Sequence, residues 1–296
     1  MIYMHKLTEG NADISKSVSH HSGDKTVSYK TVDGKEIGMS FYYPENYSNE
    51  KKYPAFVFIH GGGFGSHKIF DDQSGWAGDH LGYLARYYSY KGFIGISIDY
   101  RLASHDRQQE GYQIIDCYDD CNDAMDYILD NSESIGIDTK NVFILGESAG
   151  GHLAGLVTTK YKRQGFGFKA SFLINAITDL VGDERWNKSV PQRSDNPALA
   201  RLDKGDYAEY LSPLYNISGE TCPVVLIHGA TDGVVPPVHS ERFYEKMKEY
   251  SRECELHIIE KTNHAFLLAE YTDNIEACKV GIGIIDKYIE KKSAVI

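Results

Sequence analysis

The chain has 296 residues, of which 42% are hydrophobic and 25% charged, a balance that is ordinary for a globular protein and excludes fibrous and disordered classes. The formal net charge of −11 argues against a nucleic acid partner, because phosphate backbones select basic surfaces. No apolar run approaches the roughly 18 residues of a membrane span, and residues 1–25 contain no apolar signal sequence. We therefore expect a cytoplasmic protein without a membrane partner.

Short apolar runs alternate with longer helical patterns along most of the chain. The predicted strands are Thr26–Val32, Glu36–Tyr43, Ala55–His60, Phe93–Asp99, Val142–Gly146, Ala170–Asn175, Val224–His228 and Glu255–Glu260. The predicted helices are Trp76–Tyr90, Tyr112–Asp130, Ala149–Lys162, Val238–Tyr250 and Asn274–Glu290. The first two strands are expected to form a hairpin across Asp33-Gly34, a strong turn signal. The later alternation of apolar strands with helices predicts an α/β fold with a mostly parallel sheet.

One long segment, residues 177–217, has no clean periodicity and is rich in charge, proline and asparagine. A segment of this length without regular structure inside a compact domain is usually functional, so we interpret it as a small lid over the sheet's carboxyl edge. Residues 1–25 either add to this lid or form a frayed tail. We expect one domain over residues 1–296, with these two segments as additions.

The most specific motif is Gly146-Glu147-Ser148-Ala149-Gly150, between a predicted strand and a predicted helix. In that context G-x-S-x-G predicts a nucleophile elbow, a tight turn that holds the serine hydroxyl above the sheet. Small flanking residues suit the close packing there, and the amino end of the helix favours a developing negative charge. The pattern alone also occurs in ordinary turns, but the strand before it and the helix after it favour Ser148 as a nucleophile.

A glycine-rich stretch, His60-Gly61-Gly62-Gly63-Phe64, follows the strand Ala55–His60. Taken alone it is typical of a flexible turn. About ninety residues before a nucleophile elbow, it predicts backbone N–H groups turned inward to bind the oxyanion of acyl transfer. We expect the N–H groups of Gly62, Gly63 and Ala149 to form this oxyanion hole, and His60 to be a structural hydrogen-bonding residue.

An exposed catalytic serine needs a base and an acid that orients it. In chains with this elbow the acid and then the histidine follow the serine, on loops after late strands. His264 comes just after the last predicted strand, whereas His257 lies within that strand and would point into a face of the sheet. Asp232 follows the preceding strand and is the predicted acid, with Asp179 as the alternative. The simpler interpretation of either aspartate is a structural one, in which its side chain accepts hydrogen bonds from the backbone N–H groups of its own turn.

The five cysteines are odd in number and scattered, unlike a disulfide framework. Cys117 and Cys121 are four residues apart in an apolar helical series, so we interpret them as buried core thiols rather than a metal pair. No H-E-x-x-H motif or clustered Cys/His set is present, and we expect no metal site.

The chain resembles the esterases and lipases among the α/β-hydrolases, and the resemblance rests on the motifs HGGGF, DYRL (Asp99–Leu102), GESAGG, HGATDGVVP and NHAF. These enzymes include hormone-sensitive-lipase-like enzymes and bacterial carbohydrate acetyl esterases, and the resemblance runs from about residue 25 onward. It implies an α/β-hydrolase fold with a central eight-stranded sheet, hydrolysis through an acyl-enzyme and no cofactor. It also implies that Asp99 and Arg101 are structural residues beneath the oxyanion loop.

Two motifs of this chain differ from the usual motifs of related enzyme groups. Hormone-sensitive-lipase-like enzymes usually read G-D-S-A-G, whereas this chain has Glu147, which is closer to the acetyl and feruloyl esterase-like group. Kynurenine formamidases usually carry H-G-G-x-W, so Gly63-Phe64 counts mildly against an arylformamidase, the main alternative function. The alternative from another class is a non-catalytic binding protein on this scaffold, which would normally lose a triad member or the glycines.

The predicted function is therefore a serine carboxylesterase that cleaves short acyl esters, acetyl above all, on a polar alcohol such as a sugar. The candidate lid has few large aliphatic residues, which disfavours a lipase lid. The candidate substrate contacts are Phe64, Glu147 and Trp186. Trp186 would suit stacking on a sugar or an aromatic acid, or else anchor a solvated loop. The expected partner is a small-molecule ester, and a homodimer is left open.

Overall fold

The computed structural model describes residues 1–15, 22–64, 81–103, 112–182, 206–264, 266–267 and 275–293. The strands are β1 (Ile2–His5), β2 (Lys25–Val32), β3 (Lys35–Tyr42), β4 (Tyr53–Ile59), β5 (Ile94–Ile98), β6 (Ile137–Glu147), β7 (Ala170–Ile174), β8 (Val224–Gly229) and β9 (Cys254–Ile259). The α-helices are α1 (Gly82–Ser89), α2 (Ile114–Asp130), α3 (Ser132–Ile135), α4 (Ala149–Lys160), α7 (Asp206–Tyr210), α8 (Val238–Glu249) and α9 (Ile275–Ser293). Two short 3₁₀ helices are η1 (Leu7–Glu9) and η4 (Pro213–Asn216).

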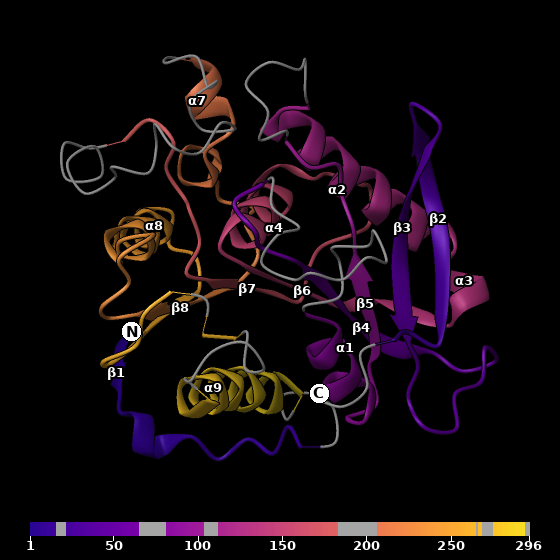
Figure 1. Cartoon of the computed structure of the whole chain (residues 1–296), viewed down its shortest axis with the longest axis horizontal. Coiled ribbons are helices and arrows are strands. Elements are labelled where there is room, and N and C mark those ends of the chain that lie inside the picture. The colour runs from indigo at the N-terminus through magenta and orange to yellow at the C-terminus, as the bar shows by residue number, and fades with distance from the viewer. Residues whose placement is uncertain are drawn as a thin grey trace.

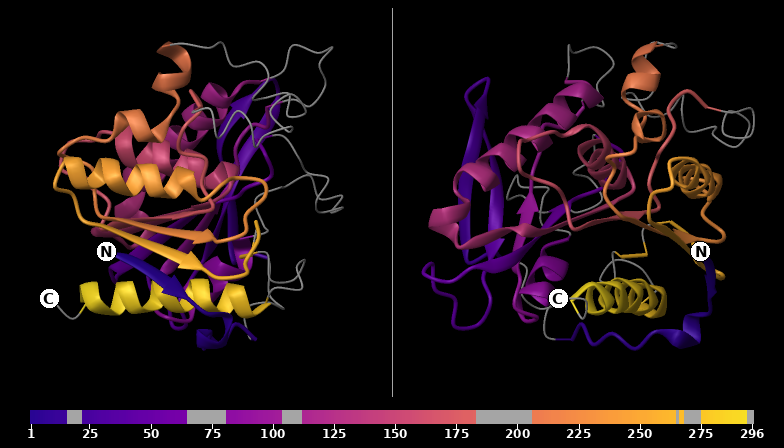
Figure 2. Two further views of the ribbon diagram at one scale, coloured as in Figure 1. Left: turned by 90° about the vertical axis from the view of Figure 1, so that its left-hand side faces the viewer. Right: turned by 180° about the vertical axis from the view of Figure 1, so that it is seen from behind.

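All nine strands form one sheet in the order β1-β9-β8-β7-β6-β4-β5-β3-β2 (Figure 1). Neighbours from β1 to β5 in this order pair in parallel, whereas β3 is antiparallel to both β5 and β2. Helices α2, α4 and α8 cover one face, and α1 and α9 cover the other (Figures 1 and 2). This arrangement confirms the predicted α/β-hydrolase fold with a mostly parallel sheet.

The two layers of core follow from the alternation of side chains along the central strands. In β4, Val57 and Ile59 pack into the cluster beneath α2 and α4, whereas Phe56 and Phe58 pack into the cluster beneath α1 and α9. All four are fully buried. A central strand that is buried on both faces reads as a continuous apolar run, which explains the sequence AFVFI.

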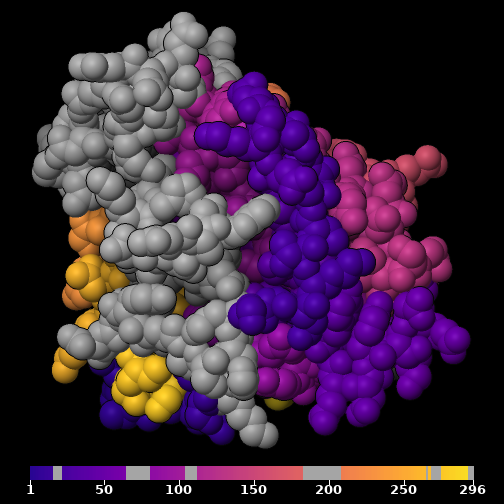
Figure 3. Space-filling view, turned by 45° about the vertical axis from the view of Figure 1, so that its right-hand side comes forward, coloured from indigo at the N-terminus to yellow at the C-terminus, as the bar shows by residue number. Residues whose placement is uncertain are grey.

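The predicted hairpin of β2 and β3 is confirmed. Asp33 and Gly34 have φ angles of 52° and 75°, and two positive φ angles at the centre of a two-residue turn match the twist of a hairpin. The hairpin continues the sheet beyond β5 and is exposed as an indigo ridge along one face of the molecule (Figure 3).

The N-terminal segment corrects the expectation of an eight-stranded sheet with a lid or a tail at residues 1–25. Ile2–His5 adds a ninth strand, β1, in parallel beside β9. The chain then runs beneath α9, on the opposite face of the sheet from α7 (Figure 1), where a Cβ on Gly10 would lie 2.9 Å from the carbonyl oxygen of Glu276. The described part of this segment therefore consists of an edge strand and a stretch of chain that packs against α9.

The lid-like segment 177–217 is described only at its two ends, and residues 183–205, including Trp186, lie outside the described residues. The N–H of Leu214 donates to the carbonyl of Thr178, and the N–H of Leu180 donates to Ser212 Oγ at 2.7 Å. Both ends of the segment are therefore fixed beside each other. Among the described residues no helix is long and apolar enough to cross a membrane.

Candidate active site

The register of the parallel strands brings distant motifs to one edge of the sheet. Ile59 at the end of β4 lies opposite Gly146, and Gly229 at the end of β8 lies opposite Ile259 of β9. After β4 the chain passes to β5 on one side and returns to β6 on the other, so a topological switch point lies between β4 and β6. Ligands of open α/β sheets bind outside the carboxyl ends of strands at such a point.

Ser148 occupies the tight turn at this switch point. Its φ of 57° and ψ of −120° are sparsely populated for a residue with a side chain, and this strain is typical of a nucleophile elbow. A Cβ on Gly146 would lie 2.1 Å from the carbonyl oxygen of Gly150, and one on Gly150 would lie 2.1 Å from that of Ile59. No larger residue fits at either position, so the motif's two glycines follow from close backbone packing. Helix α4 begins directly at Ala149.

The structure brings the three predicted triad residues together. His264 Nε2 lies 2.8 Å from Ser148 Oγ, and His264 Nδ1 lies 2.7 Å from Asp232 Oδ2. A carboxylate can only accept, so Nδ1–H donates to Asp232 and Nε2 is left to accept the hydrogen bond of the serine hydroxyl. This tautomer is the one that a general base requires.

Asp232 is held by donors on both oxygens. Oδ1 accepts the N–H groups of Val234 and Val235 at 2.8 and 2.9 Å, and Oδ2 also lies 3.3 Å from Nε2 of His228. Burial favours the neutral acid, but the hydrogen bonds from His228 and His264 outweigh it and hold the pKa of Asp232 well below its ordinary value. The carboxylate therefore stays ionised and faces the imidazole.

The acid and histidine loops are fixed to each other. Asn263 Oδ1 accepts the N–H groups of Gly233 at 3.1 Å and of His264 at 2.9 Å, and the N–H of Thr231 donates to the carbonyl of Thr262. Asn263 directly precedes the predicted base, but its role was not predicted from the sequence. It was missed because nothing in the sequence indicates which loop its side chain reaches.

The glycine loop after β4 lies directly against the elbow. A Cβ on Gly61 would lie 2.8 Å from the Glu147 carbonyl oxygen and 3.3 Å from Ser148 Cβ. Gly62 and Gly63 then have φ angles of 104° and 63°, a conformation that glycine adopts without strain.

The expected structural residues lie beneath this loop. His60 Nδ1 lies 2.8 Å from the Gly61 carbonyl and its Nε2 lies 3.2 Å from Asp99 Oδ1. The ring of Tyr100 stacks on His60 with centroids 4.2 Å apart, and its hydroxyl donates to the His60 carbonyl. Arg101 pairs with Asp120 at 2.8 Å. His60 is buried and Arg101 is half-buried, and both make structural contacts, as predicted.

Two of the three candidate substrate contacts are corrected. Phe64 is fully buried and meets the ring of His152 edge-on at 5.2 Å, so it packs inside the protein. Glu147 is 1% exposed because it precedes the turn and points into the core, where its Oε1 accepts the N–H of Leu267 at 3.1 Å. The third, Trp186, lies outside the described residues.

The alternative acid and base lie elsewhere. Asp179 forms an ion pair with Arg242 and caps the N–H groups of Val181 and Gly182, so its oxygens are already engaged. His257 is a hydrogen-bonding partner of His5, at 2.8 Å, on the edge strand β1. Within the described part of the chain, neither forms a hydrogen bond or an ion pair with Ser148 or His264.

Cys117 and Cys121 are fully buried in the core, as predicted, and all five cysteines are free thiols. The described residues contain no group of three or more His, Cys, Asp or Glu side chains that could hold a metal ion.

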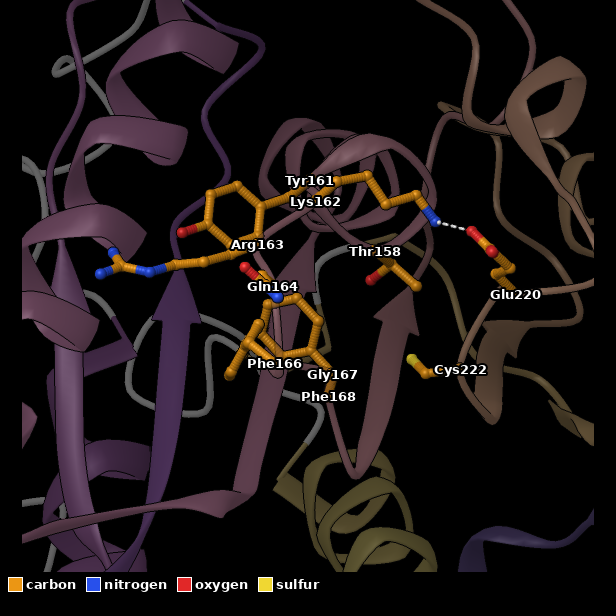
Figure 4. A pocket seen from close by; sticks show the side chains of 10 residues that line it. All are labelled: Thr158, Tyr161, Lys162, Arg163, Gln164, Phe166, Gly167, Phe168, Glu220 and Cys222. Atoms are coloured by element: carbon orange, nitrogen blue, oxygen red, sulfur yellow. Dashed lines mark hydrogen bonds and ion pairs between the residues drawn. The ribbon is translucent and has the colours of Figure 1, made fainter.

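A hollow of about 430 Å³ is lined by Thr158, near the carboxyl end of α4, and by the segment that follows this helix (Figure 4). Its aromatic wall contains Phe166 and Phe168, with ring centroids 4.9 Å apart, and Lys162 pairs with Glu220 at 2.9 Å across its rim. Because this cation is already paired and the triad is distant, the hollow adds nothing to the chemistry at Ser148.

The fold is similar to that of solved esterases. The butyrate-bound structure of esterase Est2 from the planctomycete Thermogutta terrifontis superposes with a TM-score of 0.74 and 24% identity, covering 92% of this chain and 95% of that one. A putative alpha/beta hydrolase, L404, of Acanthamoeba polyphaga mimivirus is 25% identical over 231 residues, 74% of this chain and 70% of that protein.

Esterase LipC of Mycobacterium tuberculosis is 28% identical over 175 residues, 55% of this chain and 42% of LipC, so the chain spans under half of that relative. The BD-FAE family model matches residues 39–247, more than half of the chain, and this range includes the glycine loop after β4, the turn at Ser148 and Asp232. With the fold and the motifs at the carboxyl edge of the sheet, this match places the chain in the BD-FAE family, among the esterases and lipases of the α/β-hydrolase fold.

Proposed function

We propose that the protein is a serine carboxylic-ester hydrolase in which Ser148 is the nucleophile, His264 the general base and Asp232 the acid that orients it. The observation that carries the proposal is the unbroken chain of hydrogen bonds from Ser148 Oγ through His264 to Asp232, 2.8 and 2.7 Å long. These groups come from the ends of three different strands, so local packing alone does not explain their convergence.

The geometry supports a two-step acyl transfer. Ser148 Oγ attacks the ester carbonyl carbon while its proton moves to His264 Nε2, and the imidazolium is stabilised by Asp232. Collapse of the tetrahedral intermediate transfers that proton to the leaving alcohol and leaves an acyl-enzyme. Water, deprotonated by His264, then attacks the acyl carbon and releases the acid and the free serine.

The proposed oxyanion hole consists of the N–H groups of Gly62, Gly63 and Ala149. Ala149 is the first residue of α4, so its N–H belongs to the four that have no acceptor inside the helix. The close approach of Gly61 to Ser148 brings the glycine loop to the same side. Donors fixed before the reaction stabilise charge that develops only in the transition state.

For the substrate we propose a short acyl ester, acetyl above all, of a polar alcohol such as a sugar. The support is the composition of the segment 177–217, which is polar and charged rather than aliphatic. The preference for a short acyl chain agrees with the similar esterase Est2, one structure of which is described as butyrate-bound and another as propionate-bound.

The nucleophile is tested with a fluorophosphonate probe and with p-nitrophenyl acetate. The wild type should be labelled and active, and Ser148→Ala should be neither, since loss of such a nucleophile lowers kcat by about six orders of magnitude in a well-studied protease. Ser134→Ala, an exposed serine on α3, is the matched control and should behave as wild type. Labelling that persists in Ser148→Ala would overturn the assignment.

The substrate class is tested by kcat/KM for p-nitrophenyl acetate, butyrate, octanoate and palmitate, followed by acetylated xylo-oligosaccharides. Each methylene that fits an apolar pocket adds about 0.8 kcal/mol, so the position of the maximum reports the pocket. We expect the maximum at acetate or butyrate. A maximum at octanoate or longer would indicate a lipase, and efficient turnover of N-formylkynurenine with poor ester hydrolysis would indicate an arylformamidase.

A further inference from the structure

One residue just after the candidate base is held by two buried side chains from distant parts of the chain. Leu267 lies three positions beyond His264, and both its N–H and its carbonyl are bound. The N–H donates to Glu147 Oε1 at 3.1 Å, and the carbonyl accepts the hydroxyl of Tyr83 on α1. All three residues are at most 2% exposed. The peptide groups of Leu267 are thus fixed by side chains from the end of β6 and from α1.

Helix α9 completes this anchor. A Cβ on Gly281 would lie 2.8 Å from the ring of the buried Phe266, and Cys278 Sγ lies 3.3 Å from the Tyr83 hydroxyl. Because Tyr83 donates its proton to Leu267, its oxygen accepts the thiol hydrogen. Burial raises the pKa of Tyr83 well above its ordinary value and that of Cys278 to about 12, so both keep their protons at neutral pH.

Glu147 has one oxygen more than this anchor needs. Its Oε2 is buried without a hydrogen-bond partner among the described residues. Burial raises the pKa of Glu147 to about 7. The hydrogen bond to Leu267 uses only the other oxygen, so a glutamine at this position could make the same contact.

We propose that Glu147 and Tyr83 are positioning residues that fix the loop of His264 through Leu267. This inference rests on the proposed function, because the position of His264 matters for turnover only if His264 is the base that takes the proton of Ser148.

Four variants test this proposal. Glu147→Gln keeps an acceptor and removes the charge, whereas Glu147→Leu removes both. Tyr83→Phe removes the hydroxyl that binds Leu267. Tyr87→Phe is its matched control, since Tyr87 is a buried tyrosine on the same helix whose hydroxyl donates to Asp286 at 2.6 Å. For each variant we would measure kcat and KM for p-nitrophenyl acetate, the pH profile of kcat/KM, and amide exchange of the peptide containing Leu267.

Glu147→Gln separates the acceptor from the charge. Because its amide oxygen can still accept the Leu267 N–H, its kcat should lie well above that of Glu147→Leu. A kcat in Glu147→Gln as low as in Glu147→Leu would overturn the role of the hydrogen bond to Leu267.

The anchoring of Leu267 is tested by kcat and by amide exchange at Leu267. Glu147→Leu should lower kcat by about 10–100-fold with little change in KM, and Tyr83→Phe by about tenfold, because a misplaced base slows the chemical step. In both, exchange at Leu267 should rise, whereas Tyr87→Phe and Glu147→Gln should leave it unchanged.

Equal kcat and equal exchange at Leu267 in Tyr83→Phe and Tyr87→Phe would overturn the anchoring role. This comparison tests the role even if Glu147→Leu does not fold. The two failures are distinguishable: a wild type that hydrolyses no ester refutes the proposed function, whereas exchange at Leu267 tests the anchor without turnover.

Discussion

The choice of Asp232 over Asp179 gives the sharpest test of the triad. In Asp232→Asn the amide oxygen can replace Oδ1 and still accept the N–H groups of Val234 and Val235. The amide NH₂ then takes the place of Oδ2, where it faces Nδ1 of His264, which donates to the carboxylate. To avoid two facing donors, His264 must move its proton to Nε2. In that tautomer it no longer accepts the proton of Ser148.

The expected cost follows from this tautomer switch. The equivalent change in a serine protease lowers kcat by about 10⁴, so we expect a loss of 10³–10⁴ in kcat for p-nitrophenyl acetate, or about 4–5.5 kcal/mol of transition-state stabilisation. KM should change little, since ester binding does not use this carboxylate. The thermal midpoint, measured alongside, would show that the fold is retained.

Asp179→Asn is the matched control. It breaks the ion pair with Arg242 and leaves the hydrogen bonds of His264 intact, so it should lower stability and reduce kcat by no more than a few fold. If Asp179→Asn were the damaging change and Asp232→Asn nearly neutral, the acid would lie on the earlier loop and the reasoning above would be wrong.

Three further outcomes follow. Gly150→Ala should destabilise the fold by about 3 kcal/mol or prevent folding, because its Cβ would lie 2.1 Å from the Ile59 carbonyl, whereas Gly167→Ala, with no atom within 4 Å, should be neutral in urea unfolding. Burial lowers the pKa of His152 and of His257 in the folded protein to about 4, against about 6.5 in the unfolded chain. The contribution of these two residues to the free energy of unfolding is therefore fully present above pH 6.5 and is lost as the pH falls toward 4. The raised pKa of Glu147 acts in the opposite direction between pH 7 and 4.5, so urea unfolding at pH 6.5 and 4.5 should show a steeper loss of stability in Glu147→Gln than in wild type. Because the proposed mechanism uses no metal, esterase activity should survive EDTA, and restoration by added Zn²⁺ or Mn²⁺ would contradict it.

The sequence alone predicted most of the sheet and the three residues that converge at its edge. Long apolar strands and the Asp33-Gly34 turn are local signals, and the elbow glycines are fixed by close packing that any sequence with this turn must satisfy. Strand β1 was missed because it is a four-residue edge strand in which Ile2 and Met4 are exposed while Tyr3 and His5 are half-buried. An edge strand with its apolar residues outward carries no recognisable inward pattern.

The role of Glu147 could not be predicted for a different reason. Its position next to Ser148 suggested contact with a substrate, but side chains around a tight turn point in different directions, and this one points into the core. Its partner Leu267 lies 120 residues away, and Tyr83 reaches the same residue from 184 residues away. No spacing in the sequence indicates that these two residues would meet.

Asp179 and Asp232 show what finally separates two equal candidates. Both follow parallel strands, both are buried, and both cap the backbone of their own loop through one oxygen. The difference lies in the second oxygen. Asp179 is paired with Arg242, a permanent cation, whereas the nitrogens that face Asp232 Oδ2 belong to imidazoles, that of His264 at 2.7 Å and that of His228 at 3.3 Å. A carboxylate stabilises a transient imidazolium only if no fixed cation is already paired with it, so the neighbour, rather than the aspartate itself, is the reason to propose Asp232 as the acid.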